Sequence, residues 1–257
     1  MTTRTPGSSA PPGYDPSQYP AFAVTVDVVV LTLAGGELQV LLVRRGAPPY
    51  QGAWAIPGGF KLPAETLDEA ARRELAEETG VDVATRPDAA SLLAQFGAYG
   101  DPGRDPRLNV VTVGYLAVIR DVGLIRAGTD AADASLVRVA NVLDGTVELA
   151  FDHARILRDA VDRVRRDLEI SGVATAFVGT EFTLAELRAV YEALWDVHLD
   201  GANFRRSVVS EPGWVIPTGR RAASGSHGGK PAELFRAGRA WSRGGPVKRP
   251  HRTQEPT

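Results

Sequence analysis

The chain has 257 residues, 44% of them hydrophobic, so it can bury one large core or two smaller ones. It contains no cysteine, which excludes disulfides, cysteine-based zinc sites and a thiol nucleophile. The net charge of −2 hides an asymmetry: 11 Lys and Arg against 3 Asp and Glu from residue 201 onward, and 18 against 28 before it. An acidic body with a basic C-terminal part indicates two tasks with different partners.

The N-terminal residues 1–20 are rich in Pro, Gly, Ser and Thr, a composition that predicts a disordered arm. They lack the apolar segment of a secretory signal. No apolar run in the chain approaches the roughly 18 residues that a membrane span requires. We therefore expect a cytoplasmic protein with no membrane partner.

Two β-branched, apolar runs follow, at residues 21–33 and 38–45. Gly35 and Gly36 lie between them, which predicts a hairpin. Further strands are predicted at 109–119, 91–100 and 135–142. Strands of this kind, interrupted by a helix, indicate an α/β or α+β sheet packed against helices.

That helix is predicted from Leu67 to Thr79. Thr66 is the expected N-cap, and Glu69, three residues on, completes a capping box. Gly80 is the expected C-cap, because glycine adopts the left-handed conformation at low cost.

Three glutamates, Glu74, Glu77 and Glu78, share one face of this helix near its C-terminus. Like charges at this spacing cost about 0.2–0.5 kcal/mol per pair, and the helix dipole adds about 0.3–1 kcal/mol for each exposed carboxylate. Both penalties change sign if a divalent cation lies among the carboxylates, and oxygen ligands are what Mg²⁺ selects. The alternative for a glutamate-rich helix is a solvated acidic surface.

The spacing around the glutamates favours the cation. Five residues separate Gly59 from Glu65, and seven more lead to RELAEETGV, residues 73–81. This pattern has every fixed position of the Nudix hydrolase signature, and the chain closely resembles that family. The resemblance implies an α/β/α sandwich that binds Mg²⁺ or Mn²⁺ on a diphosphate substrate. It also implies cleavage of a nucleoside diphosphate linked to another group.

Carried onto this sequence, the resemblance implies metal ligation by the Gly59 carbonyl and the three glutamates. Glu65 and Arg73 are implied to pair and hold the loop against the helix, and hydrolysis is implied to be metal-assisted. The general base is either Glu77 or a carboxylate outside the signature. Asp133 is the outside candidate, and a solvated loop aspartate is an equally good interpretation of it.

Residues that contact the substrate are less well defined by the sequence. Arginines suit phosphate and ribose contacts, and the two in the polar stretch GRDPR, residues 103–107, are the best candidates. Aromatic residues could stack on a base, although each is more often part of a core. The candidates are Arg44, Arg45, Arg104 and Arg107, with Phe96, Trp54, Tyr99 and Tyr115. The histidines at 153, 198, 227 and 251 do not cluster in the sequence.

From residue 150 the pattern becomes helical, with helices predicted at 151–170, 182–195 and 202–210. Phe204 and Val208, four residues apart, are expected to face the core. This pattern, followed by a basic glycine-rich turn, is typical of a winged helix, and the alternative is a helical subdomain that supports a dimer. Side chains suited to bases and phosphates are Asn203, Arg205, Arg206, Arg220, Arg221 and Lys230.

The segments LAFDHARIL, FTLAELRAVYEALW and NFRRSVV after such a domain resemble the Nudix-related transcriptional regulators of NAD metabolism, the NrtR family. The resemblance covers roughly residues 22–237. It implies a homodimer that binds a palindromic double-stranded DNA operator and releases it when ADP-ribose occupies the Nudix pocket. Many such regulators carry a broken signature, whereas this one is complete, so we expect pyrophosphohydrolase activity as well.

The alternative is a plain Nudix pyrophosphohydrolase whose C-terminal helices serve dimerisation only. The expected organisation is a disordered arm over 1–20 and a Nudix domain over 21–148. A linker helix over 149–180, a winged-helix domain over 181–238 and a basic disordered tail over 239–257 are expected to follow.

Overall fold

The computed structural model describes residues 14–82, 93–123, 125, 131–222, 231–239 and 244–250. Its two long strands, β1 (Ala23–Ala34) and β2 (Glu37–Arg45), pair antiparallel as the predicted hairpin. Gly35 and Gly36 close the turn with φ of 61° and 81°. Positive φ at both central residues matches the twist of the flanking strands, which explains the two glycines.

The sheet around this hairpin has the order β3-β2-β1-β6-β5, with β4 paired to β1 and β7 paired to β2. β1 and β6 are parallel, and the other pairs are antiparallel. The remaining strands are β3 (Trp54–Ala55), β4 (Gly58–Phe60), β5 (Ala94–Tyr99), β6 (Val110–Val118) and β7 (Ala131–Arg138). β3 and β4 were not predicted, because runs of two or three residues carry no alternating pattern.

The strand predicted at 135–142 is wrong beyond Arg138. There the chain turns into the short helix α2 (Val139–Leu143). Val139 and Val142, three residues apart, are both buried, which is the spacing of a helix face rather than of a strand.

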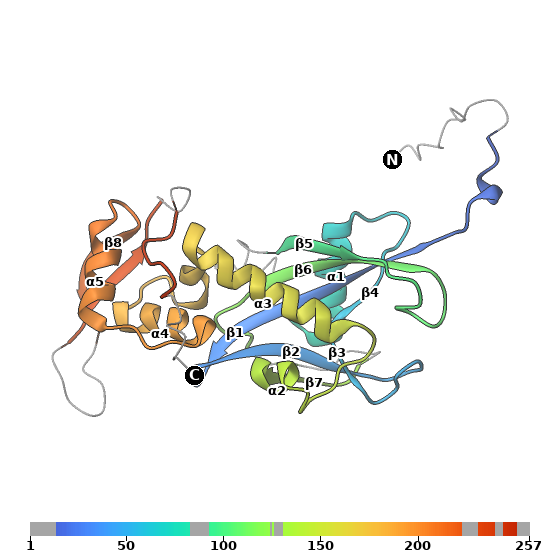
Figure 1. Cartoon of the computed structure of the whole chain (residues 1–257), viewed down its shortest axis with the longest axis horizontal. Coiled ribbons are helices and arrows are strands. Elements are labelled where there is room, and N and C mark those ends of the chain that lie inside the picture. The colour runs from blue at the N-terminus through green and yellow to red at the C-terminus, as the bar shows by residue number, and fades with distance from the viewer. Residues whose placement is uncertain are drawn as a thin grey trace, which may run out of the picture.

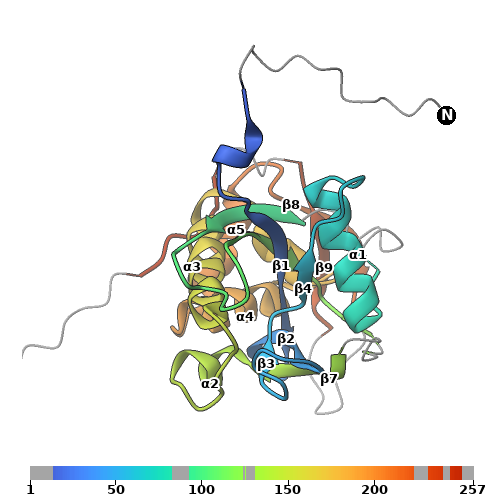
Figure 2. The ribbon, with the colours of Figure 1, turned by 90° about the vertical axis from the view of Figure 1, so that its right-hand side faces the viewer.

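Helices cover both faces of the sheet. Val26, Val28 and Val30 of β1 pack toward α1 (Leu67–Thr79), while Val29 and Leu31 pack toward α3 (His153–Ile170). Figure 2 shows α1 and α3 on opposite sides of β1. The predicted α/β/α sandwich is confirmed.

The ends of α1 are those predicted. The Thr66 hydroxyl accepts a hydrogen bond from the Glu69 backbone N–H at 3.2 Å, and the Thr66 N–H donates to the Glu69 carboxylate at 2.7 Å. Gly80 closes the helix with φ of 72°. These local bonds fix where the glutamate face begins and ends relative to the sheet.

The helix expected to act as a linker over 149–180 is instead a layer of the sandwich. Ile156, Leu157 and Val161 of α3 are completely buried in the same cluster as Val29 of the sheet. A 3₁₀ turn, η3 (Val173–Phe177), then leads toward the C-terminal unit. An amphipathic stripe as wide as that of α3 requires a partner surface, and the sheet supplies it.

The C-terminal unit consists of α4 (Leu184–Trp195), α5 (Gly201–Ser210), β8 (Val215–Arg221) and β9 (Glu233–Ala237). It lies beyond one end of α3, at the left of Figure 1. Phe204 and Val208 are buried as predicted, with the Phe204 ring edge-on to Tyr191 at 5.5 Å between centroids. β8 and β9 pair antiparallel. This arrangement of two helices and a two-stranded ribbon confirms the winged helix.

Two segments differ from the expected disorder. Residues 16–18 form a short 3₁₀ helix, and residues 244–250 lie against α3, where the Gly245 N–H donates to the Glu169 carbonyl at 2.8 Å. The remainder of the predicted arm and tail, residues 1–13, 240–243 and 251–257, lies outside the described residues. Among the described helices, none is both long and apolar enough to cross a membrane.

Candidate functional site

A cavity of about 580 Å³ opens between the sheet, the N-terminal part of the signature loop and α1. Its floor comes from β1 and β2, one wall from α1, and another from the loop before β6 and the start of α3. The polar and aromatic lining residues are Thr25, Asp27, Arg44, Arg45, Phe60, Arg73, Glu74, Glu78, Arg104, Asp105, Arg107, Phe151 and His153. Two of the three predicted metal glutamates therefore line one cavity with all four predicted substrate arginines.

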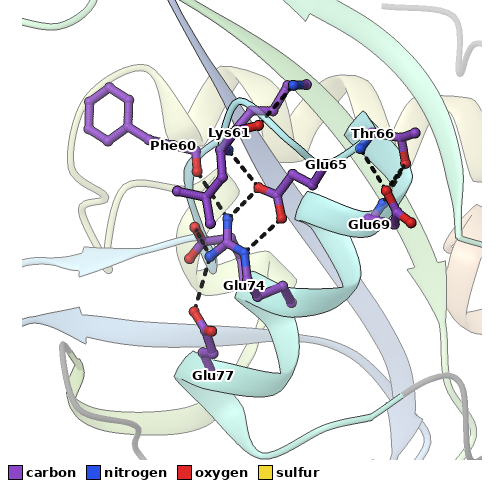
Figure 3. A network of polar contacts seen from close by, with 9 residues as sticks. Phe60, Lys61, Glu65, Thr66, Glu69, Glu74 and Glu77 are labelled. Carbon is purple, nitrogen blue, oxygen red and sulfur yellow. Dashed lines mark hydrogen bonds and ion pairs between the residues drawn. The ribbon is translucent and has the colours of Figure 1, made fainter. Parts of the chain in front are cut away.

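Arg73 is the centre of the polar network on α1. Its guanidinium donates two hydrogen bonds to Glu65, at 2.7 and 2.9 Å, and one to the Phe60 carbonyl at 3.0 Å. It also donates to Glu74 at 2.8 Å and to Glu77 at 3.0 Å. Figure 3 shows Glu65, Glu74 and Glu77 pointing toward this one guanidinium. The predicted pairing of Glu65 with Arg73 is present, and it ties the loop to the helix.

The carboxylates Glu74 and Glu78 lie deeper than Glu77. Burial, together with the neighbouring charges of Glu74 and Asp27, raises the pKa of Glu78 to about 8, although the Gly58 N–H donates to it at 2.9 Å. Burial likewise raises the pKa of Glu74. Desolvated carboxylates that crowd one another in this way favour a bound proton or a cation.

The fit of these residues to a metal ion is partial in the described geometry. No three His, Cys, Asp or Glu side chains in the described ranges are grouped closely enough to hold an ion. Glu77 is turned toward Arg73 and is 57% exposed, which separates it from Glu78. Gly59 nevertheless lies directly against Glu74, since an added Cβ would come within 2.7 Å of Oε2. The donor set is all oxygen, as Mg²⁺ and Mn²⁺ prefer.

Two arginines and an aromatic ring form the opposite side of the cavity. The Arg45 guanidinium lies 4.8 Å from the Phe151 ring centroid, and that of Arg107 lies 5.8 Å from it and 5.2 Å from the Phe60 ring. Burial and the charge of Arg107 lower the pKa of Arg45. Arg107 donates two hydrogen bonds to Asp105, at 2.7 and 3.0 Å, whereas no carboxylate in the part of the chain that the structure describes forms an ion pair with Arg45. Two convergent cations with aromatic faces suit an anionic, ring-bearing ligand.

Arg104 is held more tightly than the other arginines. It donates two hydrogen bonds to Asp152, at 2.6 and 3.0 Å, and lies 3.6 Å from Asp27. Although burial opposes its charge, the contact with Asp152 raises the pKa of Arg104. It therefore positions the start of α3 against β1, and its guanidinium is largely committed to these contacts.

The C-terminal unit presents a different surface. Asn203, Arg205 and Arg206 of α5 are exposed, and Asp200 caps the helix by accepting from the Asn203 N–H at 2.8 Å. Arg205 also pairs with Glu233 at 2.9 Å. On β8, Arg220 and Arg221 are exposed, while Lys230 lies outside the described residues. Helix α5 thus turns a polar, cationic face to solvent and its apolar face inward.

Comparison with known proteins accounts for both surfaces. The family described as NUDIX domain matches residues 21–160, and the NrtR DNA-binding winged helix domain matches residues 174–237. The ADPR responsive transcriptional repressor NtrR of Acinetobacter baylyi is 32% identical over 225 residues, covering 87% of this chain and 85% of the repressor. The chain belongs to the Nudix family and, within it, to the NrtR regulators.

Two further relatives match this NrtR-family chain over different lengths. The crystal structure of Shewanella oneidensis NrtR complexed with a 27mer DNA is similar with a TM-score of 0.70 and 30% identity. The match covers 86% of this chain and 97% of that one. The ADP-ribose pyrophosphatase of Methanocaldococcus jannaschii is 36% identical over 137 residues, or 53% of this chain and 72% of the enzyme. The family therefore spans a DNA-bound regulator and an enzyme.

Several predicted site residues lie elsewhere in the NrtR-type fold. Phe96 is a correction: its ring packs edge-on to Tyr99 in the core on the α3 side, outside the cavity lining. Tyr99 and Tyr115 are buried and bonded to Asp159 and Asp68, respectively. Trp54 stacks on Arg44 at 4.4 Å, outside the lining. Asp133 is exposed on β7 and does not line the cavity either, which removes the geometric support for it as general base.

Sequence reasoning missed Phe60, Phe151, Asp27 and His153. The four histidines are scattered in the sequence, yet His153 lies in the cavity and its Nδ1 accepts from the Ile56 N–H at 2.9 Å. Phe151 has φ of 53°, which is rare for a large side chain. Both residues lie in the segment LAFDHARIL, which carries part of the resemblance to the NrtR family, but no local pattern places them in the cavity.

Proposed function

We propose that this protein is a DNA-binding transcriptional regulator that binds ADP-ribose in its Nudix cavity and also hydrolyses it. The observation that carries the proposal is the coexistence, on one chain, of a complete signature helix lining a basic cavity and a winged helix with an exposed cationic face. The relatives' names, an ADPR responsive repressor and an ADP-ribose pyrophosphatase, support ADP-ribose as the ligand.

The cavity has the charge distribution that a nucleoside diphosphate sugar requires. Arg45 and Arg107 can bond the diphosphate oxygens, and the faces of Phe60 and Phe151 can pack on the adenine or a ribose. Arg44, which donates to the Gly52 carbonyl at 2.8 Å, lies at the rim. The volume of about 580 Å³ falls in the range of small-molecule sites.

The signature helix supports hydrolysis. Gly59, Glu74, Glu77 and Glu78 are the proposed holders of Mg²⁺ or Mn²⁺, with Glu65 and Arg73 positioning them. When bound, the cation neutralises phosphate charge and lowers the pKa of an attacking water. The water oxygen attacks one phosphorus, the bond from that phosphorus to the bridging oxygen breaks, and AMP and ribose 5-phosphate result. Glu77, the most exposed of the three glutamates, is the proposed acceptor of the water proton.

The winged helix supports binding to double-stranded DNA. The exposed face of α5 can enter a major groove, where Asn203 suits an adenine edge and Arg205 and Arg206 suit guanine or phosphate. Arg220, Arg221 and Lys230 of the wing are proposed phosphate contacts. A homodimer that places two α5 helices about one turn of DNA apart is the proposed binding species.

The nucleotide part of the proposal is tested by incubating purified protein with ADP-ribose and Mg²⁺ and separating the products by chromatography. We expect AMP and ribose 5-phosphate, and their loss in Glu78→Gln. Product that persists undiminished in Glu78→Gln would exclude the glutamate face as the active site. ADP-ribose that binds without being cleaved would leave a sensor and remove the hydrolase from the proposal.

The DNA part is tested with the region upstream of the protein's own coding sequence, by titration at several salt concentrations. We expect tight, salt-dependent binding that ADP-ribose weakens, and loss of binding in Arg205→Ala/Arg206→Ala with nucleotide binding intact. Arg158→Ala, at an exposed arginine on α3, is the control for loss of a surface charge away from α5. Equal, tight binding by the double variant and wild type would place the DNA contacts outside α5. No salt-dependent binding by either protein would leave the plain hydrolase as the better account.

A further inference from the structure

Residues 244–250, the C-terminal strap, lie across the ends of two helices that belong to different domains. The Gly245 N–H donates to the Glu169 carbonyl at 2.8 Å, and the Lys248 ammonium donates to the same carbonyl at 3.2 Å. The Arg249 guanidinium donates to the Trp195 carbonyl at 3.3 Å. Glu169 is in the last turn of α3, a layer of the Nudix sandwich, and Trp195 is the last residue of α4 in the winged helix.

The carbonyls at these two helix ends need such partners. The last four carbonyls of an α-helix receive no hydrogen bond from an N–H group of the same helix. They also carry the negative end of the helix dipole. Neither α3 nor α4 has a basic residue in its own last turn. Consecutive strap residues supply the cations instead, with Lys248 at the end of α3 and Arg249 at the end of α4.

The strap packs closely against α3 and buries one apolar side chain. A Cβ added to Gly245 would lie 2.9 Å from the Glu169 carbonyl carbon, so the strap backbone runs against the backbone of α3 and only glycine fits. Val247 is 7% exposed and belongs to the core cluster that contains Leu168, Leu194 and Trp195. The strap therefore adds a buried apolar anchor to its two caps.

Among the described residues, two other hydrogen bonds join α3 directly to α4. The Trp195 indole N–H donates to the Arg165 carbonyl at 3.1 Å, and the Arg165 guanidinium donates to the Leu194 carbonyl at 2.8 Å. These bonds join α3 and α4 on one side, and the strap joins their ends. The match to the winged-helix family ends at residue 237, so the strap lies outside the matched segment.

We propose that the C-terminal strap positions the winged helix relative to the Nudix domain, with Gly245, Val247, Lys248 and Arg249 as positioning residues for DNA recognition. The functional consequence rests on the proposed DNA binding. Two recognition helices must meet half-sites at a fixed spacing, so an orientation held by the strap sets which spacing is accepted.

The first test measures the orientation itself and needs no DNA. Because the chain has no cysteine, spin labels can be placed specifically at Arg158→Cys on α3 and Val209→Cys on α5, both of which are exposed. Unlabelled protein is added in excess, so that the measured distances lie within one chain. We expect one narrow distance distribution for the full chain and for a chain ending at residue 250. Broadening is expected in Gly245→Val, which keeps every charge, and in a chain ending at residue 243. An unchanged distribution in both strap variants would overturn the proposal, whether or not the protein binds DNA.

The second test measures DNA selection. The DNA affinities for the original operator and for sites whose half-site spacing is changed by one or two base pairs are compared. For the full chain and for the chain ending at residue 250, these affinities are expected to differ at least 10-fold. Gly245→Val is expected to discriminate less, with ADP-ribose affinity unchanged and the salt dependence of binding unchanged. A reduced salt dependence in Arg249→Ala with full spacing discrimination would instead identify Arg249 as a phosphate contact and overturn its positioning role.

Discussion

Glu65 and Arg73 are joined by two hydrogen bonds, Nε to Oε2 at 2.9 Å and a terminal nitrogen to Oε1 at 2.7 Å, across eight residues of sequence. The bonds from Arg73, with one from the Leu62 N–H, lower the pKa of Glu65 to about 2. The pair is therefore charged throughout the physiological pH range. Because the same guanidinium bonds Glu74 and Glu77, the position of the loop and that of the glutamate face are set together.

Glu65→Gln is accordingly expected to lower Mg²⁺ affinity and ADP-ribose hydrolysis by roughly 10–100-fold, the usual effect of losing a residue that orients metal ligands. Hydrolysis is measured as a function of Mg²⁺ concentration. Glu37→Gln, on the surface of β2, is the control and should leave the Mg²⁺ dependence as in wild type. An unchanged Mg²⁺ dependence in Glu65→Gln would mean that Arg73 alone orders the loop.

Arg45→Gln is expected to weaken ADP-ribose binding by about 10–100-fold, because a hydrogen bond to a charged group contributes about 1.5–3 kcal/mol. Titration calorimetry in the absence of divalent metal measures this without hydrolysis. Arg138→Gln removes an equally charged arginine from β7, where it pairs with Glu37 at the surface, and should bind as wild type does. Equal affinities for the two variants would place the diphosphate elsewhere.

Ile156→Ala tests whether α3 is a layer of the sandwich. The side chain is completely buried between helix and sheet, so its truncation is expected to cost about 2–5 kcal/mol of unfolding free energy. Ile170→Ala, in the same helix but 62% exposed, is the matched control and should change it by less than about 0.5 kcal/mol. Urea unfolding followed by circular dichroism gives both values. Similar small effects would indicate that α3 is a detached linker.

His153 gives the protein a stability term that depends on pH. Burial lowers the pKa of its imidazole below the ordinary 6.5, against the attraction of Asp27 and Asp152. A depressed folded-state pKa means that the unfolded chain binds the proton first. The stability that His153 contributes is thus fully present above pH 6.5 and is lost as the pH falls from 6.5 toward the lower pKa of the folded state. The loss in unfolding free energy is no more than about 1.4 kcal/mol per pH unit.

The measurement is the unfolding free energy at pH 7.5 and 5.5 in wild type and in His153→Asn, whose amide can still accept from the Ile56 N–H. Wild type should lose more stability than the variant over this interval. Glu78 titrates with the opposite sign, since its raised pKa favours folding at lower pH, but it is common to both proteins and cancels in the comparison. A variant that loses as much as wild type would assign the dependence to other groups.

The sequence by itself determined the features that depend on neighbouring residues. Helix α1 has the predicted bounds and caps because Thr66, Glu69 and Gly80 act within one helical turn of its ends. Phe204 and Val208 of α5 face inward because residues four apart share a face of any helix. The signature spacing and the winged-helix pattern were likewise local, and they were sufficient to identify the family.

Only the tertiary structure decided which residues meet in the cavity and across the domain junction. His153 reaches the Ile56 N–H across 97 positions, and Arg249 reaches the Trp195 carbonyl across 54. The strands β5 and β6 direct three predicted aromatic rings into the core and away from the cavity, those of Phe96, Tyr99 and Tyr115. Short-range periodicity encodes helix faces and caps, whereas contacts between distant segments depend on how the sheet and helices pack, which no local pattern records.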